Sequence, residues 1–564
     1  MRVINTVGSA RSHAPDNWPA IDWRKVERNV RVTQTRIVKA IQDGKSRRAK
    51  ALQRMLARSF CAKALAVRRV TENQGKRTSG IDKELWDSPT KKMEAIGKLK
   101  KRGYRPKPLR RVYIPKSNGK VRPLGIPTML DRAMQALYLL ALEPIAETTS
   151  DPNSYGFRKN RSTHDAMAQL FVSLSQRASA QWVLEADIKG CFDNINHDWL
   201  LRNVPMDTEV LGKWLKAGVV HKGRLAPTDD GTPQGGIVSP TLANATLNGL
   251  ESGLTAHLIA RFGKTNARKL KINVVRYADD FVITGISQEM LENEVKPWVV
   301  EFLAVRGLQL SEEKTRIVSI DEGFDFLGWN FRKYSGTLLI KPSKKNVKAF
   351  YGKIREVING HKTTTQEDLI RLLNPILWGW AMYHRPVVAK ETFSKLEHLL
   401  FWKLWRWSKR RHPRKKIKWI RKKYYHSIGR RNWVFATPVV KDDGMQKLLE
   451  LYHLPATAIV RHKKVKGGYN PFDPADELYG EKLRTERMYN HMQHRKQWTA
   501  LYRSQHGLCA LCGCKITRET GWQNHHIIYK VNGGSDALSN RVLLHPVCHT
   551  RMHQLGLKVV KPAP

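Results

Sequence analysis

The spacing of apolar positions divides the chain into segments with different predicted secondary structure. Between residues 1 and 60, apolar side chains recur at helical intervals, which predicts a basic N-terminal helical extension. From 61 to 340, helical stretches alternate with short β-branched runs bounded by Gly and Pro, a pattern typical of an α+β fold. The apolar positions of the extension are Val26, Val30, Val32, Ile37 and Ile41.

Strand signals fade after this region, and a different organisation follows. Residues 341–440 are rich in Trp, Leu, Lys and Arg, so we expect a helical domain there. Residues 441–495 are predicted to form a basic DNA-binding connector, and residues 496–564 a small Cys/His module of the size that a structural metal can stabilise. A chain of 564 residues exceeds the size of a single core, which fits this multidomain, α+β interpretation.

The charge of the chain points to a polyanionic partner. Lys and Arg number 100 against 49 Asp and Glu, a net charge of +51, while 41% of residues are hydrophobic, enough for folded cores. Basic side chains bind phosphates and release counterions, which favours nucleic acid. Apolar runs fall short of the roughly 20 residues of a membrane helix, and Met1–Trp23 lacks a signal-peptide core. We therefore expect an intracellular protein, not secreted, without a membrane partner.

One segment concentrates this charge. Trp402–Tyr425 holds 12 Lys or Arg, six Trp or Tyr and no acid. Interleaved basic and aromatic side chains provide phosphate contacts and stacking platforms, although a solvated helix face over buried aromatics is the alternative. The predicted nucleic-acid-binding residues are Arg406, Lys409, Arg410, Arg411, Arg414, Lys415 and Lys416.

Three carboxylates suggest a catalytic centre. Asp187 ends an apolar run that begins at Trp182, and Asp279 and Asp280 lie in a short polar turn between two apolar runs, which predicts a hairpin with acids at its tip. Asp-Asp also occurs at 229–230 and 442–443, but only the pair at 279–280 is flanked by strand signals. Nucleotidyl transfer uses two divalent ions held by such carboxylates. We expect Asp187 and Asp279 to bridge two Mg²⁺ ions, with Asp280 more peripheral.

The sequence Tyr-Ala-Asp-Asp at 277–280 resembles the catalytic box of reverse transcriptases, and further segments follow the order of that family. The resemblance implies a right-hand fingers and palm fold. In the hairpin at 111–127, it implies that Lys116 and Arg122 grip the incoming triphosphate. It also implies a sugar gate at Phe192, nucleotide contacts at Gln234 and Gly235, and an acid for pyrophosphate at Lys314, for which a solvated lysine is the alternative. Arg158 and Arg161 are either structural or template contacts.

Within that family, the chain resembles the proteins encoded by group II introns, which join a reverse transcriptase to a helical maturase (thumb) domain and often to an HNH nuclease. The stretches that point there are 66–82 and 373–385. The resemblance implies binding of intron RNA to assist splicing, copying of RNA into DNA from dNTPs, and cutting of the second strand of a DNA target. It implies a bacterial cytoplasm, near the nucleoid, or an organelle. A catalytically silent RNA chaperone and a defence-related reverse transcriptase are the rival interpretations.

The C-terminal module carries the spacing of a zinc site. Cys509 and Cys512 form a C-x2-C pair, and His545 and Cys548 form an H-x2-C pair. Thiolate and imidazole ligands favour a tetrahedral structural Zn²⁺ over Mg²⁺. Cys514 is an alternative ligand in place of Cys512.

The remaining polar residues of the module resemble the HNH nucleases, a ββα-metal fold. The resemblance implies that His526 is the general base, that Asn540 orients its loop or strand, and that His525 and His549 hold one catalytic Mg²⁺ or Mn²⁺. Many members have Asp where His525 stands, which leaves the metal preference open, and His553 is an alternative to His549. A zinc knuckle that only binds nucleic acid would not need this set.

Overall fold

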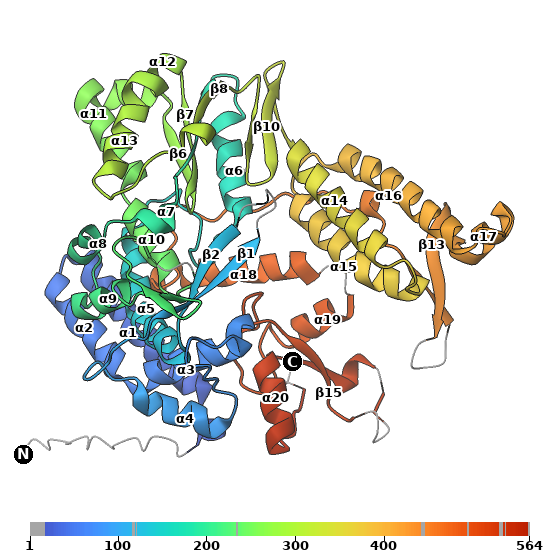
Figure 1. Cartoon of the computed structure of the whole chain (residues 1–564), viewed down its shortest axis with the longest axis horizontal. Helices are drawn as coiled ribbons and strands as arrows, with labels where there is room; N and C mark the ends of the chain where they lie inside the picture. The colour runs from blue at the N-terminus through green and yellow to red at the C-terminus, as the bar shows by residue number, and fades with distance from the viewer. Residues whose placement is uncertain are drawn as a thin grey trace, which may run out of the picture.

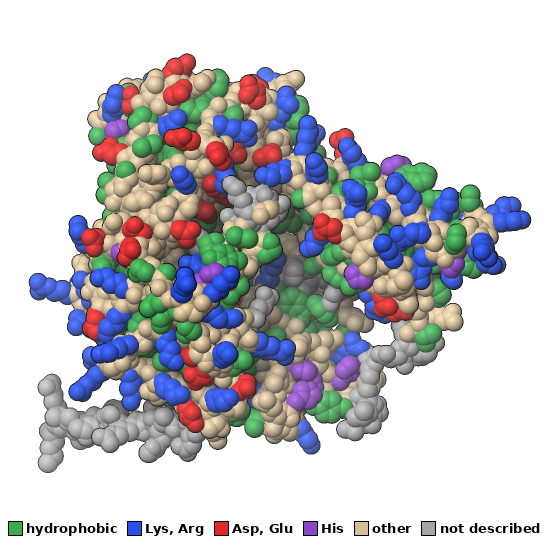
Figure 2. All heavy atoms as spheres, viewed as in Figure 1, with side chains coloured by type: hydrophobic (Ala, Val, Ile, Leu, Met, Phe, Trp, Pro, Cys, Tyr) green, Lys and Arg blue, Asp and Glu red, His purple; other side chains and the backbone are tan. Residues whose placement is uncertain are grey.

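The computed structural model describes residues 17–115, 119, 121–232, 235–440, 446–492, 496–529, 534–535 and 537–561. Helices and sheets gather into a large body on the left of Figure 1, a helical lobe on the right and a small module below. The space-filling view shows that the face between them is hollowed (Figure 2). Among the described helices, none has both the length and the apolar character that crossing a membrane would require.

The N-terminal helices pack against one long central helix. They are α1 (Trp23–Gln42), α2 (Ser46–Arg58), α3 (Phe60–Glu72) and α4 (Pro89–Lys98), and the central helix is α5 (Met129–Thr149). On α1, Val26, Val30 and Ile37 are buried, as the spacing predicts. Val32 is 52% exposed, so its assignment to the apolar face was wrong: it lies two residues after Val30, on another side of the helix.

The palm sheet is buried on both faces. Its strand order is β6-β7-β3-β8, with β3 (Trp182–Asp187), β6 (Asn273–Tyr277), β7 (Asp280–Gly285) and β8 (Arg316–Ser319). Alternate residues serve different cores: Leu184 and Ile283 join the core of the N-terminal helices, whereas Val183 and Val282 join the core shared with the helical lobe. The helices of this region are α6 (Thr163–Leu174), α7 (Cys191–Asn194), α8 (His197–Asn203), α9 (Thr208–Leu215), α10 (Ser239–Leu247), α11 (Leu250–Lys269), α12 (Gln288–Met290) and α13 (Lys296–Ala304).

Two further sheets flank the palm sheet. The hairpin expected at 111–127 forms as β1 (Leu109–Pro115) and β2 (Val121–Ile126), extended by β4 (Val219–His221) and β5 (Arg224–Ala226). The other sheet comprises β9 (Phe324–Phe326), β10 (Trp329–Tyr334) and β11 (Thr337–Pro342).

The lobe on the right contains a sheet as well as helices. Its helices are α14 (Lys344–Gly360), α15 (Gln366–His384), α16 (Lys390–Arg411) and α17 (Ile417–Tyr424). The wholly helical interpretation of 341–440 misses two strands, β12 (Tyr425–Ile428) and β13 (Arg431–Val440), and a third strand of the same sheet, β14 (Gln446–Glu450), lies in the predicted connector. Only the middle of β13, Val434 to Ala436, is buried, so little of the alternation that marks a strand is present in the sequence.

The connector is bound to the reverse transcriptase-like region through a buried acid. The oxygen Oδ1 of Asp165 accepts hydrogen bonds from His462 (2.9 Å), from the backbone N–H of Val465 (2.9 Å) and from Arg487 on α18 (Glu477–Met492) at 2.6 Å. Arg161 donates to the carbonyl of Tyr469 at 3.0 Å.

Arg158 forms a buried ion pair with Glu147, at 2.8 Å. Both arginines of this segment, Arg158 and Arg161, therefore make structural contacts.

The module below contains α19 (Lys496–Ser504), β15 (Gln523–His526), β16 (Arg541–Leu544) and α20 (Pro546–Leu555).

Candidate functional site

The palm sheet brings the three predicted carboxylates to one edge. Asp187 ends β3 and lies directly opposite Asp280, the first residue of β7. Tyr277 pairs with Asp280 across the β6–β7 hairpin, so Ala278 and Asp279 form its two-residue turn. Ala278 adopts a left-handed conformation, with φ of +59°, which non-glycine residues adopt only where the surroundings enforce it.

A buried network holds this turn in place. Arg276 is buried and donates from Nη1 to Asn244 Oδ1 and to the carbonyl of Ala278, each at 3.1 Å. Asn244 in turn donates to the carbonyl of Gly156 at 2.7 Å. A Cβ on Gly156 would lie 2.2 Å from the backbone nitrogen of Ala278, so only glycine allows this approach. The sequence pattern predicts no role for these residues, although Gly156 lies two positions before Arg158, which it does single out.

The clustered carboxylates perturb one another. Asp280 lies at the exposed end of its strand, yet the protein atoms around its carboxyl group, its hydrogen bond with Asp187 and the negative charge of Asp279 raise its pKa to about 7. Burial, followed by repulsion from Asp187, also raises the pKa of Asp279. Such a cluster is stabilised by added positive charge, which is the electrostatic requirement of a cation site.

Two basic side chains act electrostatically on the acids. Nζ of Lys314 lies 2.6 Å from Oδ2 of Asp187, and this hydrogen bond raises the pKa of Lys314. The positive charge of Arg122 on β2 acts on Asp279 and opposes the rise of its pKa. The structure therefore brings Arg122 and Lys314 to the carboxylates from two different elements.

Two other predicted nucleotide contacts, Phe192 and Gly235, fall within the described residues. Phe192 on α7 is half-buried and meets Phe157 edge to face, with ring centroids 6.2 Å apart. Gly235, with φ of +121°, approaches β2 so closely that a Cβ there would lie 2.8 Å from the carbonyl oxygen of Gly125. Lys116 and Gln234 lie outside the described residues.

The four predicted zinc ligands converge in the C-terminal module. The ligand atoms of Cys509, Cys512, His545 and Cys548 all lie within 4.8 Å of one another, and this group could hold a metal ion. Hydrogen bonds among the neighbouring thiols lower the pKa of Cys512 and raise that of Cys548, so within this group the thiolate is favoured at Cys512. Cys514 lies beside the group, with its Sγ directed at the carbonyl of Cys512 at 3.7 Å.

A second group of possible metal ligands comprises His525, His549 and His553, with ligand atoms within 4.8 Å of one another. His525 lies on β15, and the other two are one turn apart on α20. The sequence offered His553 as an alternative to His549, and the structure brings both to His525. His526, the next residue of β15, is paired with Arg541 and is not part of this group.

Asn540 binds the described residues on either side of the loop after β15. Its Oδ1 accepts from the backbone N–H of Ile528 at 2.8 Å, and its Nδ2 donates to the carbonyls of Ile528 (3.0 Å) and Ser535 (2.8 Å). Gly534 lies so close that a Cβ would fall 1.9 Å from the oxygen of Ile528. A buried amide thus ties together the two ends of the segment after β15.

The basic segment forms an exposed surface at the end of the right-hand lobe. Figure 2 shows Lys and Arg side chains gathered where Figure 1 places α16 and α17. Arg411 differs from its neighbours, because it donates to the carbonyls of Lys362 (2.9 Å) and Thr364 (2.8 Å) and lies over Trp407. The exposed members are Arg406, Lys409, Arg410, Arg414, Lys415 and Lys416.

Four family models match successive parts of the chain. The N-terminal domain of reverse transcriptase matches residues 18–99, and reverse transcriptase (RNA-dependent DNA polymerase) matches residues 114–331. The maturase-specific domain of group II introns matches residues 347–425, and HNH endonuclease matches residues 509–555.

Individual relatives agree with these matches. Protein YkfC of Escherichia coli is 35% identical over 257 residues, covering 40% of this chain and 67% of YkfC. The group II intron-encoded protein LtrA of Lactococcus lactis is 32% identical over 339 residues, covering 49% of this chain and 55% of LtrA. Maturase-like protein 1 of Euglena gracilis is 25% identical, covering 64% and 76% respectively.

A solved telomerase structure from Candida albicans gives a TM-score of 0.31 at 13% identity, covering 54% of this chain and 58% of the telomerase. The matched domains follow one another in the order in which the fold presents them: N-terminal helices, palm sheet, helical lobe and metal-binding module. The chain therefore belongs to the group II intron-encoded reverse transcriptases that carry a maturase domain and an HNH endonuclease domain.

Proposed function

We propose that Asp187, Asp279 and Asp280 form the centre at which this protein copies RNA into DNA. The observation that carries the proposal is the register of β3 against β7, which places Asp187 opposite Asp280 and beside the Asp279 turn. Hard carboxylate oxygens suit Mg²⁺, and Asp187 and Asp279 are the residues that would bridge two such ions. When bound, these ions would activate the primer hydroxyl and stabilise charge on the triphosphate.

The surrounding side chains would bind and orient the nucleotide. Arg122 on β2, whose positive charge acts on Asp279, would hold the triphosphate together with Lys116. Phe192 would support the sugar, while Gln234 and Gly235 would contact the base pair. Lys314, which donates a hydrogen bond to Asp187 at this edge, would donate a proton to the leaving pyrophosphate.

A paired substitution tests the polymerase assignment. Asp279→Asn removes one ligand charge with little change in shape, so dNTP incorporation on an RNA template in Mg²⁺ should fall about 1000-fold. The matched control is Asp230→Asn, in the exposed Asp-Asp pair at 229–230, which should leave incorporation unchanged. Full incorporation by the Asp279 variant would refute the site.

The C-terminal module supports a second proposed activity, cutting of the second DNA strand. His525, His549 and His553 would hold one Mg²⁺ or Mn²⁺, His526 would activate water, and the Cys/His group would bind a structural Zn²⁺. Asn540 would keep the loop after β15 in place. His526→Ala should abolish nicking of a DNA duplex while RNA-directed synthesis continues, and retained nicking would refute the general-base role.

The right-hand lobe and the connector would supply the nucleic-acid contacts. In this proposal, residues 341–440 bind the intron RNA and assist its splicing, and residues 441–495 contact the DNA target. Support comes from the exposed basic side chains of α16 and α17, because each phosphate contact adds counterion release to binding. The protein would then act where its intron RNA and chromosome meet, in a bacterial cytoplasm or an organelle.

A further inference from the structure

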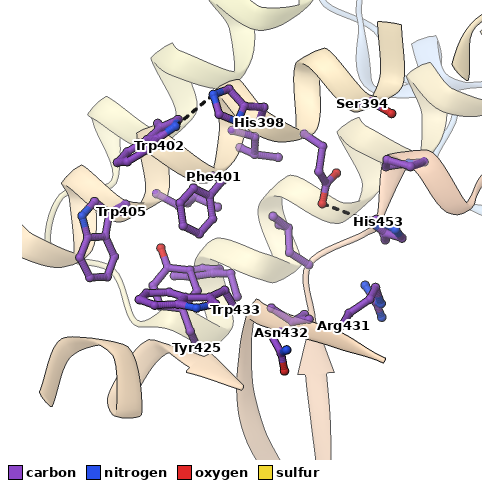
Figure 3. Close-up of a pocket in the computed structure, with 17 residues that line it drawn as sticks. Ser394, His398, Phe401, Trp402, Trp405, Tyr425, Arg431, Asn432, Trp433 and His453 are labelled. Atoms are coloured by element: carbon purple, nitrogen blue, oxygen red, sulfur yellow. Dashed lines mark hydrogen bonds and ion pairs between the residues drawn. The ribbon is translucent and has the colours of Figure 1, made fainter. Parts of the chain in front are cut away.

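A pocket lies in the right-hand lobe, between α16 and the sheet β12–β14 (Figure 3). Its volume is about 790 Å³, within the range of roughly 300–1,000 Å³ typical of small-molecule sites. In Figure 1 the elements that form it lie at the end of the molecule away from β6 and β7, so it is separate from the carboxylate edge. None of the roles proposed above uses it.

Aromatic rings form one side of the pocket. Trp402, Phe401 and Trp405 project from α16, and Tyr425 and Trp433 face them from β12 and β13 (Figure 3). The rings of Trp405 and Trp433 stand edge to face, with centroids 5.7 Å apart. Trp402 remains 44% exposed, so the aromatic side of the pocket is open to solvent.

A bulge directs Trp433 into the pocket. Ile428 pairs with Arg431 and His426 pairs with Val434, so Asn432 and Trp433 together oppose the single residue Ser427. Trp433 adopts φ of +59°, an unfavourable conformation for a bulky side chain. Bulges re-aim side chains, and strained residues concentrate at functional sites, so this geometry points to a binding role for the ring.

Polar groups of both charges complete the lining, including Glu397, which lies 3.2 Å from Nδ1 of His453, and unpaired positive charge lies outside it. Arg431, which pairs with Glu450, and Asn432, whose Oδ1 accepts from Ser427 at 2.8 Å, lie on the side opposite Trp402 (Figure 3). The guanidinium of Arg421 lies 4.6 Å from the ring centroid of Trp433. The neighbouring exposed residues include Arg406, Lys409, Lys422 and Lys423, so an anionic backbone would be attracted to the rim.

We infer that this pocket binds a single unpaired base of a folded RNA, with the base stacked on the tryptophan rings and its edge facing Arg431 and Asn432. Stacking on aromatic side chains combined with an arginine near the base edge is how proteins hold extruded RNA bases. The inference rests on the proposed binding of intron RNA and assigns one nucleotide of that partner to one place in the fold.

The test uses the full-length protein and two fluorescent RNA hairpins, one with a single bulged 2-aminopurine and one fully paired. The wild-type protein should bind the bulged hairpin more tightly and change the 2-aminopurine fluorescence. Trp433→Gly removes the ring and also relieves the left-handed strain, so it should weaken binding of the bulged hairpin about 10- to 100-fold without unfolding the lobe. The paired hairpin should bind as before.

Two further variants sharpen the result. Trp402→Leu should reproduce the loss, whereas Phe171→Leu, which alters an exposed aromatic residue of α6 outside the pocket, should not. Equal binding of both hairpins by the wild type, or equal loss of both in Trp433→Gly, would overturn the inference. Incorporation of dNTPs, measured in parallel on an RNA template, should be unchanged in Trp433→Gly. If the wild-type protein did not incorporate dNTPs, the proposed polymerase activity would be refuted. The hairpin-binding result would still decide whether the pocket binds an unpaired base.

Discussion

Lys314 and Asp187 form an ion pair of 2.6 Å at the edge of the palm sheet, so an ammonium group neutralises one of three clustered carboxylates. A metal ion bound to Asp187 must share or replace this contact. The pair therefore links the charge of Lys314 both to metal affinity and to proton donation.

Replacing Lys314 separates these two effects. In Lys314→Gln, the competing cation is lost, so the Mg²⁺ concentration for half-maximal dNTP incorporation should fall. The rate at saturating Mg²⁺ should fall about 100-fold, because the proton donor is also lost. Lys264→Gln, on the exposed surface of α11, serves as the control. An unchanged rate together with an unchanged Mg²⁺ dependence would show that the ion pair has no part in catalysis.

Gly156→Ala tests the bracing of the catalytic turn. The added methyl group would meet the backbone nitrogen of Ala278 at 2.2 Å and must displace the β6–β7 hairpin. Displacement of about 1 Å costs roughly 100-fold in rate, and we expect a loss of that size in dNTP incorporation, with DNA nicking retained. Gly352→Ala on α14, where the methyl group meets no atom within 4 Å, should leave incorporation intact. Comparable activity of the two variants would contradict the bracing role.

Zinc content distinguishes Cys512 from Cys514 as ligands. Metal analysis of the purified wild type should give about one zinc per chain, and Cys509→Ser and Cys512→Ser should each lose it and make the tail sensitive to proteases. Cys514→Ser should keep the metal. Zinc loss in Cys514→Ser with retention in Cys512→Ser would exchange the two assignments.

Asp165 makes attachment of the connector dependent on pH. Burial alone would raise the pKa of Asp165, but the hydrogen bond from His462 and the charge of Arg487 outweigh it and lower the pKa to about 2. Because the folded-state pKa lies below the unfolded value of about 3.8, the stabilisation is complete above pH 4 and is lost as the pH falls toward 2. The contribution of Asp165 to the free energy of unfolding amounts to about 2 kcal/mol.

Asp165→Asn should therefore lower the melting temperature at pH 7 and expose the connector to proteases, with the difference from the wild type shrinking below pH 4. Asp198→Asn, an exposed acid on α8, is the control. A difference from the wild type that stayed constant from pH 7 to pH 2 would contradict the pKa shift.

The sequence predicted the elements that carry strong local patterns. The apolar run into Asp187 and the two runs around Asp279 are strands in the structure, and the two Cys/His pairs converge as their spacing indicated. Each of these strands and Cys/His pairs is formed by residues close together in the sequence, so a pattern along the chain predicts it.

Features that depend on distant contacts could not be found in this way. The position of Gly156 against Ala278, the path from Arg276 to Asn244, and the burial of Asp165 by the connector all join segments that carry no shared pattern. The strands β12 to β14 were missed because their buried residues do not alternate regularly with exposed ones. The pocket beside Trp433 depends on a bulge, which sequence spacing does not show.

The bonds between α1 and the connector affect how the chain is made. Arg31 donates to the carbonyl of Pro471 across 440 residues, Thr35 donates to that of Phe472, and Gln42 binds Asp473. During synthesis on the ribosome, this face of α1 stays uncovered until the connector, late in the chain, has been made. Removing the nuclease together with its connector would leave that face bare, so the two activities are better separated by point substitutions than by shortening the gene.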